Sequence, residues 1–140
     1  VNFRPPDWGQ GKGQGSFNFL GFCFYWTRSR KGRAVVKLKT ARDRFTRTVK
    51  ELGEWLRGNM HQPIAEQHSQ LCAKLQGHFQ YFGVTFNFKA LMNMLTEVRG
   101  RWRKCLARRG GKAYWSWERF CSFLRTFPLP RAKIVHNVFE

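Results

Sequence analysis

Regular hydrophobic patterning begins at position 17, after a Gly- and Pro-rich start (1–16) that we interpret as a flexible linker. The run FNFLGFCFYW (17–26) is apolar at nearly every position, and RAVVKLK (33–39) is rich in β-branched residues. A short Gly-bearing segment separates the two runs, which predicts a β-hairpin over 17–39. Because an isolated hairpin is only marginally stable, we expect other strands to complete this sheet. The first residue is Val rather than Met, and we expect the chain to be a fragment.

From Thr40 onward the hydrophobic period becomes that of helices. Thr40 and Asp43 resemble a capping box, and Gly58, Gly83 and the Gly pair at 110–111 are plausible helix ends. We expect four helices, capped or opened near Thr40, Pro63, Asn87 and Ser116. Their predicted apolar faces are Phe45, Val49, Leu52 and Leu56 in the first, Ile64, His68, Leu71, Leu75, Phe79 and Phe82 in the second, Phe88, Leu91, Leu95, Val98, Trp102 and Leu106 in the third, and Phe120, Phe123, Leu124 and Phe127 in the fourth.

The pattern therefore predicts a mostly α fold, with an N-terminal β-hairpin followed by a basic bundle of three to four helices. We divide the chain into a linker (1–16), the hairpin (17–39), a helical domain (40–110), and a short C-terminal helix with a Pro-containing extended tail (111–140).

Charge changes the picture most. The 140 residues carry a formal net charge of +18, with 26 Lys and Arg against 8 Asp and Glu, while 42% hydrophobic residues supply a core. Repulsion at this level opposes compaction, so we expect a polyanionic partner, nucleic acid before an anionic membrane. The predicted RNA-binding residues form two groups, namely Arg28, Arg30, Lys31, Arg33, Lys37, Lys39, Arg42, Arg44, Arg47 and Lys50 in the hairpin and first helix, and Arg99, Arg101, Arg103, Lys104, Arg108, Arg109 and Lys112 in the third helix and its exit.

The stretch RGRWRKCLARRGGK (99–112) holds seven of these cations and no acid. At 100° per residue, Arg101, Lys104 and Arg108 share a strip well away from Trp102, whereas Arg109 lies seven residues after Trp102 and points inward. An ordinary solvated helix face interleaves acids with its cations, and this face does not.

Other kinds of chemistry have little support in the sequence. The acids are scattered, although a two-metal phosphoryl-transfer site needs clustered carboxylates. Four distant cysteines, Cys23, Cys72, Cys105 and Cys121, are interpreted as buried free thiols. The four histidines lack the spacing of a zinc site, and His68 is interpreted as a hydrogen-bonded core residue.

Aromatic residues beside Lys112 and Arg119 allow two interpretations. Exposed rings among cations would form a stacking platform for unpaired bases, whereas buried rings would pack the last helix onto the bundle. We favour packing for Trp117 and leave Tyr114 open between the two.

A resemblance to a known family is carried by several segments in order. FNFLGFCFYWTRSRKGRAVVKLKT resembles the end of the palm of group II intron reverse transcriptase/maturases, and LQGHFQYFGVTFNFKALMNML (75–95) resembles their maturase-specific segment. RGRWRKCLARR and WSWERFCSFLRTFPLPRAKIVH are similar to the C-terminal end of bacterial members. The likeness covers about residues 16–138, and its motif residues are Gly77, His78, Tyr81, Gly83 and Trp102.

The chain also departs from that family. Gln76 stands where Arg is common, and Phe79 and Phe82 stand where Tyr is usual. The family's Tyr-x-Asp-Asp motif and its partner Asp belong to segments upstream of this chain, and the zinc-containing endonuclease extension of some members is absent from it.

The resemblance implies the thumb, or X, domain of a maturase with the end of the palm at its front, in a polypeptide that is an RNA-directed DNA polymerase. Its implied partners are intron RNA, an RNA/DNA template–primer duplex, and the fingers and palm of the same polypeptide, in a bacterial cytoplasmic ribonucleoprotein. It implies no cofactor in this chain, with Mg²⁺ only at the palm active site.

Two alternatives remain open at this point. One is a complete small basic protein that binds RNA or DNA with no polymerase attached. The other is a membrane-active cationic protein, which we consider weaker because the predicted helices have apolar faces that can bury one another, whereas a membrane-surface helix offers its apolar face to lipid.

Overall fold

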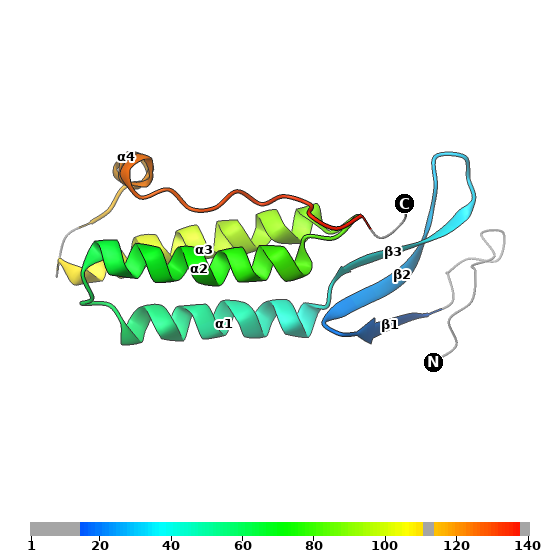
Figure 1. Ribbon diagram of the computed structural model, residues 1–140, viewed down its shortest axis with the longest axis horizontal. Helices are drawn as coiled ribbons and strands as arrows, with labels where there is room; N and C mark the ends of the chain where they lie inside the picture. Colours follow the sequence, from blue (N-terminus) through cyan, green and yellow to red (C-terminus); the bar gives the residue numbers. More distant parts are fainter. Residues whose placement is uncertain (1–14, 111–113, 138–140) are drawn as a thin grey trace.

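The computed structural model describes residues 15–110 and 114–137, so nearly all of the predicted linker, and Lys112, lie outside the described residues. Three strands precede four helices (Figure 1). The elements are β1 (Ser16–Phe19), β2 (Phe22–Arg28), β3 (Ala34–Thr40), α1 (Arg42–Gly58), α2 (Ile64–Phe82), α3 (Phe88–Arg109) and α4 (Trp117–Thr126). The predicted mostly α fold, with a hairpin ahead of a helical bundle, is confirmed.

The sheet is antiparallel with the order β1-β2-β3. β2 and β3 form the predicted hairpin, pairing from Phe22 with Thr40 to Arg28 with Ala34. The predicted first strand is instead two strands, because the chain reverses at Leu20 and Gly21, whose φ values are 53° and 88°. Two consecutive positive φ values between paired strands are those of a tight type I′ turn.

Contacts from the helices fix this turn against the bundle. The Tyr81 hydroxyl donates to the Leu20 carbonyl at 2.6 Å, and the Ala41 N–H donates to the Gly21 carbonyl at 2.8 Å. The Phe22 ring lies 5.0 Å from the Phe82 ring and 5.7 Å from the Tyr81 ring. The end of the sheet is thereby joined to the C-terminal turn of α2.

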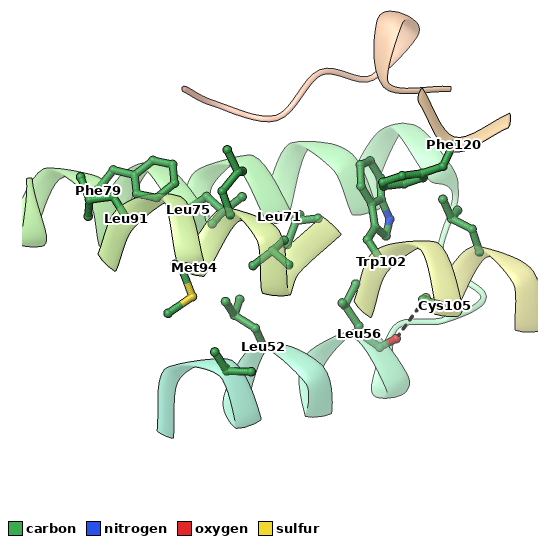
Figure 2. Packing of buried hydrophobic residues seen from close by; sticks show 14 of the residues in the cluster. Leu52, Leu56, Leu71, Leu75, Phe79, Leu91, Met94, Trp102, Cys105 and Phe120 are labelled. Carbon is green, nitrogen blue, oxygen red and sulfur yellow. Dashed lines mark hydrogen bonds between the residues drawn. The ribbon is translucent and has the colours of Figure 1, made fainter. Parts of the chain in front are cut away.

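The helices α1 and α3 run in the same direction, and α2 runs back between their ends (Figure 1). At one end, two hydrogen bonds join Thr40, just before α1, to Asn87, just before α3. The Thr40 N–H donates to Asn87 Oδ1 at 2.8 Å, and the Asn87 Nδ2 donates to the Thr40 hydroxyl oxygen at 2.9 Å. At the other end, the Cys105 thiol of α3 contacts the Leu56 carbonyl of α1 at 3.8 Å (Figure 2). The parallel pair places cations from both C-terminal halves beside each other.

The core lies between the three long helices, with α4 packed over Trp102 through Phe120 (Figure 2). Most of the predicted apolar positions are buried. A few further residues are also buried, and a few predicted positions are partly or fully exposed. Met94, Cys105 and Gln67 are also buried, Phe45, Ile64, Phe123, Leu124 and Phe127 are partly buried, and Phe88 is exposed.

Gln67, rather than His68, is the polar residue at the centre of α2. It is fully buried, its Oε1 accepts from the Trp102 indole at 2.8 Å, and its Nε2 donates to the Asn59 carbonyl at 3.0 Å. His68 is half-buried at the edge, where its Nε2 lies 2.7 Å from the Pro128 carbonyl. The interpretation of His68 as hydrogen-bonded is confirmed, and its place in the core is not.

The predicted capping box at Thr40 and Asp43 is wrong. Thr40 belongs to β3, Ala41 is the residue before α1, and no side chain caps that helix. The Thr40 side chain bonds to Asn87 instead, because both are buried where β3 meets α3 and each needs a partner there. Ser116 caps α4 as predicted, accepting from the Arg119 N–H at 3.1 Å.

The tail after α4 is extended, as predicted, and returns along α2 to the sheet end of the bundle (Figure 1). The Val135 and His136 N–H groups both donate to the Gly83 carbonyl, at 2.7 and 2.9 Å. A Cβ at Gly83 would lie 2.4 Å from the Phe79 carbonyl oxygen and 2.8 Å from that of Lys133, so only glycine fits there.

All four cysteines are free thiols, as predicted. Only Cys105 is buried, however, while Cys23 and Cys72 are partly exposed and Cys121 is exposed. The prediction of burial fails for Cys121 because the short α4 has only one buried side chain, Phe120.

Candidate nucleic-acid interface

Cations gather along the seam between α1 and α3, which we call the α1–α3 groove. Three adjoining hollows form it, of about 440 Å³ at the sheet end, 400 Å³ in the middle and 220 Å³ at the far end. Phe45 is shared by the first two hollows, and Arg57 and Arg101 by the last two, so the groove is continuous. The cations that line it are Lys39, Arg42, Lys50, Lys89, Arg57, Arg101, Lys104 and Arg108.

The groove continues onto the sheet. A broad depression of about 820 Å³ lies between the three strands and the N-terminal half of α1. The cations Lys39, Arg42, Arg47 and Lys50 line it, and Asp43 is the one acid among its described lining residues. Since α1 has 17 residues at about 1.5 Å each, this cationic surface follows the bundle for roughly 25 Å. That is several times the size of one phosphate group, so it suits a chain of phosphates better than a small ligand.

Acids do little to neutralise this surface. Among residues 15–110 and 114–137 the one ion pair joins the Arg101 Nε to Glu97 Oε2 at 3.9 Å, one turn apart on α3. Both side chains are about half exposed, at 41% and 48%, so the pair contributes little. Arg101 therefore keeps most of its charge available to a partner.

Arg101 does not lie on a free outer strip as we had expected, because its side chain crosses to α1 and rests on Gly53. A Cβ at Gly53 would lie 3.1 Å from the Arg101 Nη1. A glycine inside a helix costs about 1 kcal/mol relative to alanine, and at Gly53 it leaves room for this close approach of the guanidinium. Lys104 and Arg108 remain exposed beside it.

Arg57 also belongs to the groove, although the sequence reasoning did not select it. It lies in the last turn of α1 and faces Arg101, Lys104 and Arg108 across the far-end hollow. Its spacing of seven residues from Lys50 puts the two on one helix face, and that spacing could have identified it.

A second group of predicted residues lies apart from the groove, at the tip of the β2–β3 hairpin. The tip projects away from the helices (Figure 1). Bonds between Ser29 and Arg33 close its turn, with the Ser29 N–H donating to the Arg33 carbonyl at 2.8 Å and the Arg33 N–H to the Ser29 hydroxyl at 3.1 Å. Four exposed cations stand there: Arg28, Arg30, Lys31 and Arg33.

Cations nearer the junction of sheet and bundle lie over aromatic rings. The Lys39 and Lys37 ammonium groups are 5.1 and 4.9 Å from the ring centres of Tyr25 and Phe86, and the Arg44 guanidinium is 5.9 Å from that of Phe82. A cation over a ring face is held in place but keeps its charge. These three side chains contact rings of this chain and keep their charge available to a partner.

The cations of the third helix divide among three surroundings. Arg101, Lys104 and Arg108 line the groove, whereas Arg103 lies on the α4 side, 4.3 Å from the Trp117 ring centre and donating to the Trp115 carbonyl at 2.8 Å. Arg109 points inward, as its spacing predicted, and donates to the carbonyls of Met60 and Gln62 in the α1–α2 turn. Arg99 is half-buried.

Two tryptophans, one just before α4 and one at its start, each lie against an arginine side chain. The Arg119 guanidinium lies 4.1 Å from the Trp115 ring centre, and Trp117 contacts both Arg103 and the buried Phe120. Trp117 is 50% exposed and Tyr114 is 76% exposed. The predicted packing of Trp117 onto the bundle therefore holds for only one side of its ring.

The family-motif residues gather mostly where the sheet meets the bundle. Tyr81 and Gly83 hold the β1–β2 turn and the returning tail, as described above. The His78 ring lies 4.6 Å from the Phe82 ring, tilted by 30°, and burial first, then the charge of Arg44, lowers the pKa of His78 to about 4. Gly77 is exposed with open space around it, and Trp102 is fully buried.

Potential metal ligands do not cluster in the described residues. No group of three or more His, Cys, Asp or Glu side chains there could hold a metal ion. Burial raises the pKa of the Cys72 and Cys105 thiols, which disfavours the reactive thiolate. No helix among the described residues is long and apolar enough to cross a bilayer.

Comparisons with protein-family models, with curated proteins and with solved structures gave no significant match to this chain.

Proposed function

We propose that this chain is the RNA-binding thumb/maturase domain of a group II intron reverse transcriptase, with the end of the palm in its β-sheet. The observation that supports this most is the cationic α1–α3 groove, in which eight cations face one groove acid, Glu97. In this proposal the polyanion is RNA, as the family resemblance implies, and an RNA strand would bind in the groove.

Phosphate contacts account for the chemistry of such a surface. Arginine presents a planar fork of donors that matches two phosphate oxygens, and lysine adds a point charge. An A-form duplex is recognised mainly through its phosphates and 2′-hydroxyl groups, which a groove rich in arginine can contact without reading sequence. Intron RNA and a template–primer duplex both present this backbone.

The partners within the polypeptide follow from the same proposal. The polymerase carboxylates and their Mg²⁺ would belong to the fingers and palm upstream, and this domain would hold the substrate against them. A Tyr-x-Asp-Asp reading frame running in frame into Val1 is the expected genomic context, and a start codon directly before Val1 would instead support a complete small basic protein.

Salt dependence of RNA binding tests the proposal directly. If about six phosphates are neutralised, the affinity of the 140-residue chain for group II intron RNA should fall roughly a thousandfold between 50 and 200 mM salt in a filter-binding titration. A structured RNA of equal length serves as the comparison. Equal affinity for both RNAs would favour the general basic protein, and a flat salt dependence would overturn RNA binding altogether.

A charge-matched pair of variants locates the binding surface. Changing Arg101, Lys104 and Arg108 together to Gln should weaken RNA binding at least tenfold and leave the thermal melt nearly unchanged. The control replaces three exposed cations outside the groove, Arg125, Arg131 and Lys133, by Gln. Equal losses from both triple variants would show that net charge, and not the groove, determines binding.

A further inference from the structure

The far-end hollow of the groove differs from the rest of the cationic surface because its cations converge on one small space. Arg57 from α1 and Arg101, Lys104 and Arg108 from α3 line a space of about 220 Å³. The other residues that line it are Gly53, Leu56, Met60 and Cys105. At roughly 30 Å³ per water molecule, this space is larger than a single phosphate group needs. None of the described residues that line it is an Asp or Glu.

The Arg101 guanidinium is placed in this hollow by the packing of the helices. Gly53 lets it rest on the α1 backbone, since a Cβ at that position would lie 3.1 Å from its Nη1. The Arg101 Nε is inaccessible to solvent and has no hydrogen-bond acceptor in the described part of the chain, with Glu97 Oε2 3.9 Å away. Because that atom has no exposed surface, an anion in the hollow would contact the exposed donors of the Arg101 side chain, which is 41% exposed.

The helix ends do not balance this charge. The C-termini of α1 and α3 lie at this end of the bundle and carry about half a negative charge each, and the N-terminus of α2 offsets part of that. Four full positive charges therefore face less than one negative charge from the backbone. The balance favours an anion in the hollow.

We propose that this hollow is a discrete anion pocket that binds one phosphate group, with Arg57, Arg101, Lys104 and Arg108 as its ligands and Gly53 as a positioning residue. The identity of the occupant as one backbone phosphate of RNA rests on the function proposed above. The pocket differs from general electrostatic attraction in being saturable and specific to a few named side chains.

Titration with inorganic phosphate tests the pocket without RNA. The ¹H–¹⁵N signal of the Arg101 Nε–H is followed in the 140-residue chain while phosphate replaces chloride at constant ionic strength. We expect a saturable shift of the Arg101 signal and none for Arg125, an exposed arginine on α4. A linear drift, or equal shifts at both arginines, would mean ionic screening only and would overturn the pocket.

Two glycines of α1 provide a matched pair of variants. Gly53→Ala pushes a methyl group against Arg101, whereas a Cβ at Gly58, at the end of the same helix, meets nothing within 4 Å. Phosphate affinity should fall by about tenfold in Gly53→Ala and stay unchanged in Gly58→Ala. Should Gly53→Ala fail to fold, Arg101→Lys keeps the charge, loses the fork and should give a similar loss. Unchanged phosphate affinity in Arg101→Lys would overturn the pocket.

RNA binding then separates the pocket from the proposed function. In Arg101→Gln, the slope of log affinity against log salt should decrease by about one, as expected for the loss of one phosphate contact. A steep slope that Arg101→Gln leaves unchanged would overturn the pocket's role in RNA binding and leave the proposed function standing. If the chain binds phosphate saturably but binds no RNA, the pocket stands and the proposed function is overturned.

Discussion

Trp102 separates the apolar interior of the bundle from the cationic face of α3, and its replacement is the sharpest test of the fold. The side chain is fully buried, and its ring lies 5.1 Å from the Phe123 ring and 6.0 Å from the Phe120 ring. Its indole N–H donates to Gln67 Oε1 at 2.8 Å. Trp102→Ala removes both the packing and the hydrogen bond.

The expected loss is large on both counts. Replacing a buried Trp by Ala typically costs about 3–5 kcal/mol, and a buried oxygen left without its donor costs about 1–3 kcal/mol more. A domain of this size has a free energy of unfolding of about 5–15 kcal/mol. We therefore expect Trp102→Ala to lose about 4–8 kcal/mol, which would unfold most of the chain at 25 °C if the parent lies in the lower half of that range.

A double-mutant cycle isolates the hydrogen bond. Trp102→Phe keeps an aromatic ring in the core but loses the N–H and part of the indole volume, so it should cost at least about 2 kcal/mol, and Gln67→Met should cost about 2 kcal/mol. Because each single change leaves one partner unpaired, the double variant should lose at least 1 kcal/mol less than the sum. Urea denaturation followed by far-ultraviolet circular dichroism measures all four free energies of unfolding.

Two results would contradict this reasoning. A Trp102→Ala chain that unfolds within 1 kcal/mol of the parent would mean that the ring is not buried. Free energies in the cycle that add within about 0.5 kcal/mol would mean that Trp102 and Gln67 do not interact.

Three further predictions concern the junction of sheet and bundle. The pKa of His78 is lowered from 6.5 to about 4, so between these pH values the unfolded chain binds more protons than the folded chain. The free energy of unfolding should therefore fall, by at most about 3 kcal/mol, as the pH drops from 6.5 to 4. His78→Phe should flatten this pH dependence in urea titrations at several pH values. Gly83→Ala should cost more than about 2 kcal/mol because the methyl group meets two carbonyl oxygens, while Gly100→Ala, with open space around it, should add about 0.5–1 kcal/mol, and equal thermal melts would contradict both. Asn87→Ala should cost about 3 kcal/mol, since it removes two bonds to Thr40 and one to the Phe82 carbonyl, and a loss below 1 kcal/mol by urea denaturation would show these bonds to be unimportant.

Periodicity predicted the helices well because their cores are formed by apolar side chains at helical spacing. It placed His68 instead of Gln67 in the core, since both are polar and adjacent in sequence, and only the position of the Trp102 indole decides between them. Phe88 matched the pattern and is nevertheless exposed, although Leu91 less than one turn later is fully buried. Such exceptions depend on tertiary contacts that hydrophobic spacing does not encode.

The turn at Leu20 and Gly21 was invisible for a related reason. Leucine rarely adopts a positive φ, and it stands in an apolar run with no polar turn residue. The contacts that hold it, from Tyr81 and Ala41, come from distant parts of the chain. For the candidate interface, spacing correctly grouped Arg101, Lys104 and Arg108, but only the parallel arrangement of α1 and α3 brings Arg57 to them.

The returning tail has a practical consequence for experiments on this molecule. Because Val135 and His136 are fastened to Gly83, the described chain starts and finishes at the pole that carries the strands, and the anion pocket lies at the opposite pole. A label attached at the described ends, Gly15 or Asn137, would therefore lie at the pole opposite the proposed pocket. Protein labelled there should consequently bind phosphate as the unlabelled protein does.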